Sequence, residues 1–367
     1  MSADASGDLT REVLINGPVS RKELSSRLGL SPASLTRLSR PLIDAGLLVD
    51  MDIVDGGVGR PSKSLDVQLD SRNYAGIKLT STRVFAVCTD IRANVLRSAE
   101  KVLENHNPQH ISQQVKDAVE AAAYGRPIDC AGVTLGGQVA GSVVVSSPFL
   151  ELRDFDLGAT LSKTLGVRVV LENDVTALTA AQHWFGVGRG VTDFATVTVG
   201  VGVGYGLISH GRLAIGADNG LGCHLVLDQD GDRCGQGHLG CAAAVLSSDG
   251  MLSQYKRFSG LDVSFEEFIR ATQSSEEFAL QTMRSAANSL GHLCAAIANL
   301  ARVDMVAVAG ENAGLFESFR ELVLVGFQEH RTVGGAAVAL VFDDEGFGAW
   351  ARSAAAVAIR ASFGVLE

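Results

Sequence analysis

The sequence predicts a small winged helix-turn-helix of mixed α and β structure, followed by a large α/β region of two lobes. Capping residues and a glycine turn mark two short helices near the N-terminus. From residue 74 onward, apolar strands alternate with amphipathic helices, among them one predicted over residues 312–328, and this pattern is typical of mostly parallel sheets covered by helices. Because this alternation occurs twice, over residues 84–185 and 194–362, we expect two lobes with a ligand cleft between them.

Length and composition set the outer limits. The 367 residues suit roughly two or three domains, and we place a winged-helix domain at residues 1–70 and a two-lobed domain at residues 73–367. The net charge of −10 argues against a protein that coats nucleic acid non-specifically. The sequence has neither a long uncharged apolar run nor a signal peptide, so we expect no membrane span. Six sparse cysteines predict a reduced, cytoplasmic location.

Two short helices are predicted between residues 20 and 43. Ser20 suits the N-cap of the first helix, Glu23 stands three residues later as in a capping box, and Gly29 ends the helix. Ser31 and Pro32 start the second helix at once, with Pro32 at its first position. The second helix of such a motif enters the major groove of DNA.

The second helix carries polar and basic residues on its outward side, while Leu35 and Leu38 face inward. Basic residues outnumber acidic ones by five to one over residues 20–43, which adds local positive charge to an acidic protein. We therefore predict DNA contacts from residues of both helices, namely Arg21, Ser31, Ser34, Thr36, Arg37 and Arg40. The simpler alternative is a solvated helical hairpin.

A wing is predicted after the second helix. Residues 47–49 and 53–54 are predicted to be short strands, and the glycine-rich residues 55–64 form a hairpin tip. Arg60 and Lys63 in this tip are placed to contact phosphates or a narrow minor groove of DNA. The same glycines also suit a simple linker between domains, and the two roles are compatible.

Three motifs of the α/β region carry chemistry. A buried strand ends at Asn173 and Asp174, and an amide beside a carboxylate offers both donors and acceptors to a polyol. Glycine occupies every second position over residues 200–206, which lets a ligand approach the backbone closely. Further along the chain lie three clustered residues that suggest a metal site, namely His224, Cys234 and Cys241.

Together with Gly59-Arg60-Pro61 of the wing, these motifs resemble the ROK family of bacterial sugar kinases and sugar-responsive repressors. The resemblance covers residues 10–364. It implies a two-lobed, actin-like and hexokinase-like fold of the ribonuclease H-like class. Repressor members of the family add an N-terminal winged helix, as this sequence does.

Departures from the family pattern predict that the kinase chemistry is lost. Family kinases open the first lobe with Asp-x-Gly-Gly-Thr, whereas residues 78–82 read Lys-Leu-Thr-Ser-Thr here. Lys78 replaces the carboxylate that serves magnesium, and side chains replace both glycines. Val201 stands where a threonine is usual, and residues 309–311 keep only part of the adenosine-side turn. We therefore predict no ATP binding and no catalytic residue, with Asp174 at a vestigial base position.

The sugar side of the family site is partly kept. The resemblance implies sugar contacts from Gly137, Asn173, Asp174 and His224. One family glutamate is missing from residues 220–224, and Ala243 stands where a second is usual. The structural alternative for Asp174 is that it caps the helix at residues 175–185.

The metal ligands are incomplete. The family pattern is a histidine, then Cys-x-Cys, then a further cysteine, and the matching residues here are His224, Cys234, Gln236 and Cys241. Glutamine is a poor zinc ligand. His238 and Cys223 are candidate substitutes, and the alternative is reduced cysteines packed in a glycine-rich loop. Zinc binding therefore stays open, and no other cofactor is expected.

The sequence favours a DNA-binding transcriptional regulator, a repressor of carbohydrate-related genes whose inactive kinase-like domain senses a sugar, a sugar derivative or a sugar phosphate. The expected partners are a double-stranded DNA operator and further copies of the chain in a homodimer or homotetramer. One alternative is an ATP-dependent sugar kinase with an added DNA-binding domain, in which Asp174 is the base. Another is a regulator controlled by a protein partner.

Overall fold

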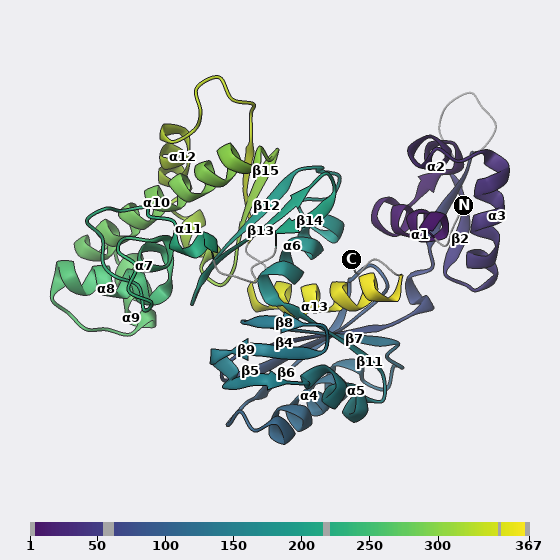
Figure 1. Cartoon of the computed structure of the whole chain (residues 1–367), viewed down its shortest axis with the longest axis horizontal. Coiled ribbons are helices and arrows are strands. Elements are labelled where there is room, and N and C mark those ends of the chain that lie inside the picture. The colour runs from purple at the N-terminus through teal and green to yellow at the C-terminus, as the bar shows by residue number, and fades with distance from the viewer. Residues whose placement is uncertain (1–3, 54–61, 216–220, 344–345, 364–367) are drawn as a thin grey trace. The chain divides into compact units, whose positions relative to one another are not determined.

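The computed structural model describes residues 4–53, 62–215, 221–343 and 346–363. The chain divides into two compact units (Figure 1). The first comprises Met1–Ala177 and Trp350–Glu367, and the second comprises Leu178–Ala349. Arg60 and its wing neighbours Gly59 and Pro61 lie outside the described residues. Within the described ranges, the chain has no helix that is both long and apolar enough to span a membrane.

The first unit begins with a winged helix. Its elements are α1 (Asp4–Asn16), β1 (Val19–Ser20), α2 (Arg21–Leu28), α3 (Pro32–Asp44), β2 (Leu48–Ile53) and β3 (Ser62–Val67). The strands pair antiparallel in the order β1-β3-β2. The helices and the sheet enclose a small apolar core, to which α1, α2, α3 and β3 contribute the buried residues Leu14, Leu24, Leu35 and Leu65.

Local capping defines both helices of the helix-turn-helix. Ser20 Oγ accepts a hydrogen bond from Glu23 N at 3.2 Å, and Gly29 ends α2 in the left-handed region with a φ of 62°. Ser31 Oγ accepts from Ser34 N at 3.1 Å at the start of α3. The predicted caps and glycine turn are therefore confirmed. The Glu23 carboxylate bonds to the Arg27 guanidinium in the next turn instead of completing a capping box.

A five-stranded sheet forms the body of the first unit, in the order β11-β7-β4-β5-β6. Its strands are β4 (Tyr74–Leu79), β5 (Arg83–Thr89), β6 (Val95–Val102), β7 (Cys130–Leu135) and β11 (Arg168–Asn173). β7 runs parallel to β4 and β11, whereas β5 is antiparallel to β4 and β6. A smaller antiparallel sheet contains β8 (Gln138–Ala140), β9 (Val143–Ser147) and β10 (Leu152–Phe155).

Helices cover both faces of the larger sheet (Figure 1). α4 (Pro108–Ala123) and α5 (Leu157–Leu165) lie on one face, and α13 (Gly346–Ser362) lies on the other. Two glycines let α13 approach the strands closely. A Cβ atom at Gly76 in β4 would lie 2.0 Å from Ala351 O, and one at Gly132 in β7 would lie 1.8 Å from Ala354 O. Because no side chain fits at such distances, the helix backbone rests directly on the strand backbones.

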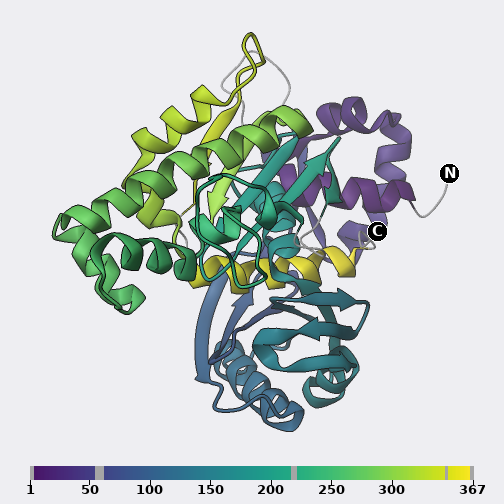
Figure 2. The ribbon, with the colours of Figure 1, turned by 60° about the vertical axis from the view of Figure 1, so that its left-hand side comes forward.

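The second unit contains another five-stranded sheet, in the order β14-β13-β12-β15-β16. Its strands are β12 (Phe194–Val199), β13 (Val203–Ser209), β14 (Arg212–Ile215), β15 (Met305–Ala309) and β16 (Ala339–Phe342). Its helices are α6 (Asp174–Phe185), which starts in the first unit, then α7 (Ala242–Leu246), α8 (Ser248–Ser259), α9 (Phe265–Gln273), α10 (Glu277–Ala301), α11 (Ala313–Glu317) and α12 (Arg320–Glu329). The long helix α10 lies across the sheet and packs against α12 (Figure 2).

Two predicted elements are wrong in extent. The sequence predicts one helix over residues 312–328, but α11 and α12 are separate because Phe319 leaves the helical region, with φ −112° and ψ 22°. It also predicts two short strands at residues 47–49 and 53–54. The structure has the single strand β2, since every residue from Leu48 to Ile53 pairs with β3.

An arginine joins the winged helix to the first-unit sheet. Arg92 lies in the turn between β5 and β6, and its guanidinium donates to Leu14 O and Val13 O of α1, both at 3.0 Å. It also forms an ion pair with Asp66 of β3. Gly17 allows this contact, because a Cβ atom there would lie 2.5 Å from Arg92 Nη2. The winged helix is therefore bonded to the sheet through one side chain that contacts two of its elements.

The close approach of α13 to the sheet predicts a specific sensitivity. Gly132→Ala places a methyl group 1.8 Å from Ala354 O, so the helix or the sheet must shift. We expect the free energy of unfolding to fall by about 1–3 kcal/mol, measured by urea unfolding. Gly348→Ala in the same helix is the control, because nothing lies within 4 Å of its Cβ position. It should be neutral or stabilising by about 1 kcal/mol, and equal stability of the two variants would contradict the packing.

Candidate DNA interface and ligand sites

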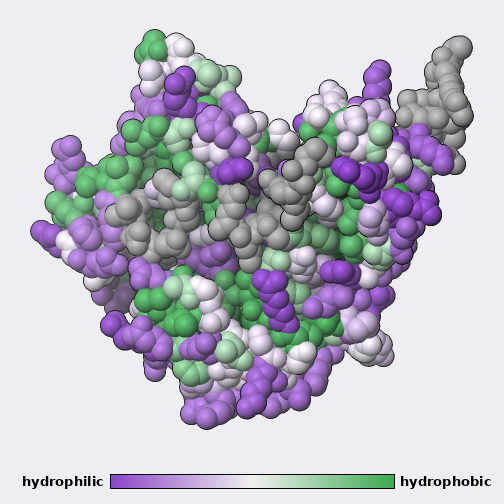
Figure 3. Space-filling model, turned by 45° about the vertical axis from the view of Figure 1, so that its right-hand side comes forward, coloured by the Kyte–Doolittle hydropathy of each residue, from purple (hydrophilic) through white to green (hydrophobic). Residues whose placement is uncertain are grey.

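The outward face of α3 presents the predicted DNA-contact residues. Thr36, Arg37 and Arg40 are exposed, whereas Leu35 on the opposite side is 1% exposed. Arg40 forms an ion pair with Asp44 at 3.0 Å, and such an exposed pair is weak enough to exchange for a phosphate. Hydrophilic residues are frequent on the winged-helix surface at the right of Figure 3. This face thus has the charge and polarity that DNA recognition needs.

Other predicted contact residues also bond within the module. Arg21 forms an ion pair with Asp50 of β2 at 2.7 Å, so it braces α2 against the wing strands. The hydroxyl groups of Ser31 and Ser34 bond to each other at 3.0 Å while Ser31 caps α3. Lys63 is exposed on β3. The structure therefore gives Arg21, Ser31 and Ser34 a role in shaping the module, which is compatible with a DNA contact.

Asp174, which the sequence predicts to stand at a vestigial base position, is paired with a buried lysine. Lys78 near the end of β4 is 5% exposed and forms an ion pair with the Asp174 carboxylate at the start of α6. Its Nζ atom lies 5.0 Å from the centre of the Trp350 ring, where a cation is attracted to the aromatic face. Asp174 Oδ1 accepts a hydrogen bond from Val175 N at 2.9 Å. The carboxylate is thus neutralised by a cation of the protein itself.

Asn173 supports the fold around this pair. Its Nδ2 donates to Gly137 O at 2.9 Å, and its Oδ1 accepts from Thr176 N at 3.1 Å. Asn173 therefore caps α6, the role that the sequence offered to Asp174, which is the first residue of the helix. One amide N–H and one oxygen lone pair of Asn173 are left for a ligand. Gly137, Asn173 and Asp174 lie together in the first unit, whereas His224 belongs to the second.

The glycine-rich hairpin of the second unit lies beside a carboxylate. β12 and β13 pair antiparallel across a tight turn, in which Gly200 N donates to Gly202 O at 3.0 Å. The Glu311 side chain packs against Gly200, because a Cβ atom there would lie 1.9 Å from Glu311 Oε2. Val201 at the tip of the turn is exposed. The carboxylate thus occupies the space beside the Gly200 backbone that a closely bound phosphate group would need.

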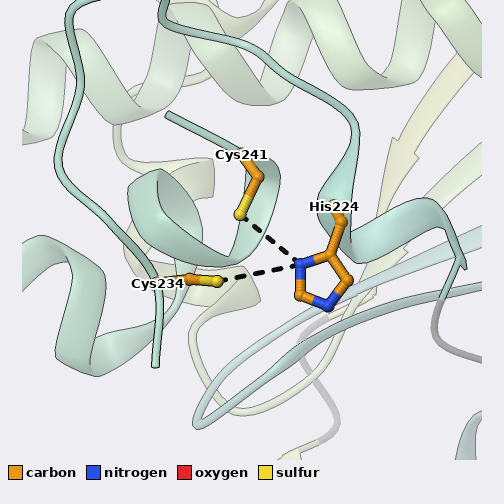
Figure 4. Close-up of side chains that lie close together, drawn as sticks. All are labelled: His224, Cys234 and Cys241. Carbon is orange, nitrogen blue, oxygen red and sulfur yellow. Dashed lines mark hydrogen bonds between the residues drawn. The ribbon is translucent and has the colours of Figure 1, made fainter. Parts of the chain in front are cut away.

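His224, Cys234 and Cys241 come together in the loop that precedes α7. Both sulfur atoms face Nδ1 of His224, at 3.9 Å for Cys234 and 3.6 Å for Cys241 (Figure 4). The three ligand atoms all lie within 4.8 Å of one another. Ligand atoms around a tetrahedral zinc ion, with bonds of about 2.0–2.3 Å, are about 3.3–3.8 Å apart. The separation of His224 and Cys241 lies in this range and that of His224 and Cys234 exceeds it by 0.1 Å, so a small inward shift lets the three residues hold a zinc ion.

The two thiols of this cluster differ in acidity. Burial raises the pKa of Cys234, but hydrogen bonds from the backbone of Gln236 and from the side chain and backbone of His238 outweigh it and lower the pKa to about 7. For Cys241, burial is the main cause of a pKa above the usual value. Because the thiolate is the form that binds a metal, Cys234 is the more readily available ligand.

Sequence reasoning missed the partners of several of these residues. Lys78 stands out in the sequence because it replaces an expected carboxylate. Its partner Asp174 lies 96 positions away, so no local pattern indicates the ion pair. Glu311 was noted only as part of a glycine turn, and its contact with Gly200 has no local sequence signal. Such contacts depend on tertiary packing that residue spacing does not encode.

The fold and these sites define a class of protein, a sugar-kinase-like α/β domain joined to an N-terminal winged helix. The ROK family matches residues 74–324, and the chain belongs to this family. The predicted family and fold class are therefore confirmed.

Relatives of this chain include both regulators and kinases. The DNA-binding transcriptional repressor Mlc of Escherichia coli (strain K12) is 25% identical over 348 residues, covering 86% of this chain and 85% of Mlc. The glucokinase of Thermotoga maritima is 26% identical over 246 residues, covering 60% of this chain and 77% of the kinase. A crystal structure of a ROK family transcriptional regulator, a homologue of the E. coli Mlc protein, superposes with a TM-score of 0.80 at 22% identity, covering 99% of this chain and 98% of that one. The similarity in fold to this regulator thus extends over the winged helix.

Loss of Lys78 would leave a buried carboxylate without its cation. The two side chains are only 6% and 14% exposed, so Lys78→Met should lower the free energy of unfolding by about 3–5 kcal/mol in urea. Lys116→Met is the control, because it breaks an exposed pair with Glu120 that contributes less than about 1 kcal/mol. Adding Asp174→Asn to Lys78→Met should recover much of the stability. If the double variant recovers nothing, packing of the Lys78 side chain matters and its charge does not.

Proposed function

We propose that this ROK protein is a DNA-binding transcriptional repressor of carbohydrate-related genes, and that its kinase-like domain senses a ligand without phosphorylating it. The observation that carries the proposal is the buried Lys78–Asp174 pair, in a chain that also presents the exposed Arg37 on a capped helix. The first disables a kinase site and the second suits DNA recognition. Similarity to the repressor Mlc over 86% of this chain supports the same function.

Three features oppose phosphoryl transfer. A kinase needs a base that is free to take a proton, a magnesium ion and loops that admit phosphates. Here the Lys78 ammonium group holds Asp174 and stands where a metal-side carboxylate would be needed. Thr80 and Ser81 stand in place of two glycines, and Glu311 puts a carboxylate against Gly200. Lys78 acts on the base and the metal ion, whereas Thr80, Ser81 and Glu311 act on the loops that admit phosphates, so a single compensating change would not restore activity.

The ligand suited to the first unit is a polyhydroxylated molecule, such as a sugar, a sugar derivative or a sugar phosphate. Asp174 accepts hydrogen bonds from hydroxyl groups, and Lys78 donates to their oxygen atoms. The free N–H and lone pair of Asn173 extend the same pattern of donors and acceptors. A polyol that enters this group of residues competes with the Lys78–Asp174 pair, which makes the pair sensitive to the ligand.

A continuous set of contacts leads from this pair to the winged helix within the first unit. Lys78 lies under the Trp350 ring of α13, and Arg352 in the same helix donates to Ala93 O at 3.1 Å. The preceding residue, Arg92, bonds to α1 and β3 of the winged helix. A ligand that alters the Lys78–Asp174 pair would therefore shift the population of winged-helix positions and so change the affinity for DNA.

The DNA partner is a double-stranded operator with two half-sites, bound by a homodimer or homotetramer in the cytoplasm. Helix-turn-helix proteins place one recognition helix per half-site in the major groove, about one helical turn apart. We assign base-edge contacts to Thr36 and Arg37 and phosphate contacts to Arg40 and Lys63, an assignment supported by the exposure of all four side chains.

DNA binding is tested by gel shift on the region upstream of the chain's own gene, with and without a panel of sugars. Arg37→Ala should weaken binding by about 1–3 kcal/mol, the range for loss of a base contact. Arg153→Ala removes an exposed arginine of β10 and should leave affinity unchanged. If the wild-type chain binds no neighbouring promoter at low salt, the proposal is wrong. If Arg37→Ala alone has no effect, recognition lies elsewhere in the module.

The coupling is tested with Arg92→Ala, which removes the bonds to α1 and the ion pair with Asp66. We expect this variant to bind operator DNA in the absence of sugar, because Arg92 lies outside the predicted DNA face. The change in DNA affinity caused by the effective sugar should shrink or vanish. Arg97→Ala removes an exposed arginine of β6 that lies over the Tyr124 ring and should respond as the wild type does. A full response in Arg92→Ala would exclude this path.

A further inference from the structure

The zinc-like cluster of the second unit has three well-placed ligands, and a closed structural zinc site needs four. His224, Cys234 and Cys241 supply three ligand atoms within 4.8 Å of one another. At the position where the family pattern has another thiol, this chain has the exposed Gln236. An amide is a weak ligand for zinc, so a stable site needs a donor from another residue.

His238 is held next to Cys234 by the backbone of a tight turn. Cys234 N donates to His238 O at 3.0 Å, and Gly237 N donates to Cys234 O at 2.8 Å. Gly237 has a φ of 89°, a conformation that glycine adopts without strain. The turn therefore folds residue 238 back onto residue 234, and the glycines on both sides of Gln236 make this possible.

The His238 ring reaches both sides of the cluster. Its Nδ1 atom lies 3.7 Å from Cys234 Sγ, which is within the separation expected for two ligands of one tetrahedral ion. Its centre lies 4.1 Å from the centre of the His224 ring. His238 is exposed, so its ring is free to turn toward an ion without disturbing the core. Cys234 and His238 are separated by three residues, which is within the usual spacing of paired zinc ligands.

The geometry points to His238 as the fourth ligand of a zinc site with His224, Cys234 and Cys241. Two thiolates and two neutral imidazoles balance the charge of Zn²⁺, and they form a four-coordinate set of a type common in structural sites. In this site His238 supplies the ligand that the family pattern takes from a cysteine at the position of Gln236.

Cys223 is the competing candidate, and its place in the fold is less suitable. It directly precedes His224 in the 3-10 turn η4 (Leu221–His224). Successive side chains of a 3-10 turn point about 120° apart around its axis. The Cys223 and His224 side chains therefore leave the turn in different directions, although the Cys223 thiol is near enough to Cys241 and Cys234 that their charges, after burial, raise its pKa. His238 is the better placed residue, because its Nδ1 atom already lies 3.7 Å from Cys234 Sγ.

The ion would connect an exposed loop to the core. Cys241 is fully buried and is the N-cap of α7, while the turn from Cys234 to His238 is largely exposed. The described part of this loop has isolated bridges at Val226–Cys241 and Arg233–Leu239, together with single backbone bonds such as Leu227 N to Gly240 O at 2.8 Å, and no regular strand. A metal held by both segments would fix the loop in place, as zinc does where regular structure is sparse.

The inference is tested by titrating the reduced, full-length chain with Co²⁺ and then displacing it with Zn²⁺. Tetrahedral Co²⁺ has intense visible bands, and the intensity of its sulfur charge-transfer band increases with the number of bound thiolates. We expect one ion per chain with two thiolates. His238→Ala should weaken metal binding by about tenfold or more, since even the loss of a residue that only orients a metal ligand has an effect of that size. Cys223→Ser should leave the affinity and the spectrum unchanged.

The double variant Gln236→Cys/His238→Ala supplies a decisive comparison, because it restores the thiol of the family pattern. It should regain tight binding with a charge-transfer band of three thiolates. Two results would overturn the inference: loss of binding in Cys223→Ser but not in His238→Ala, or no stoichiometric ion in the wild-type chain. Circular dichroism of each variant checks that it is folded. DNA binding is not part of these measurements, so their outcome is independent of the proposed function.

Discussion

Lys78 and Asp174 form an ion pair where β4 and β11 end at the same edge of the first-unit sheet, and the neighbouring elements are arranged around it. Removing two charged groups from water is costly, and a buried pair is stable only when its geometry and its other contacts are good. Here the Trp350 ring covers the ammonium group, and Val175 N bonds to the carboxylate. The positions of β4, α6 and α13 must therefore all suit this pair. The same pair puts an ammonium group at the sequence position where the family kinases have a carboxylate.

The close packing of α13 connects this pair to the rest of the first unit. Gly76 and Gly132 allow the helix backbone to lie on the strands, which brings Trp350 to Lys78. Further along the same helix, Arg352 holds the turn that carries Arg92. Since interiors are close-packed, a shift at one end of such a set of contacts is not absorbed locally. This packing gives the proposed sensor a physical route from its ligand site to the DNA-binding module.

The parts of the fold that local chemistry determines were predictable from the sequence. Ser20 and Ser31 cap helices wherever they precede a suitable turn, and Gly29 ends a helix because it adopts a positive φ without strain. The end of a buried strand at Asn173 also followed from pattern. The contacts made by Lys78, Arg92 and Glu311 were not predictable, because their partners are distant in the chain and are selected by packing. Phe319 broke a predicted helix through its backbone conformation, for which the apolar pattern has no signal.

The central claim is that the Lys78–Asp174 pair leaves a kinase fold without kinase chemistry. The most direct test is ADP release by the wild-type chain from magnesium-ATP, measured over a panel of hexoses and hexosamines by a coupled assay. The account predicts no release above the rate without protein for any sugar. Sugar-dependent release that Asp174→Asn abolishes would contradict it, because the carboxylate would then be acting as a base despite its pairing with Lys78.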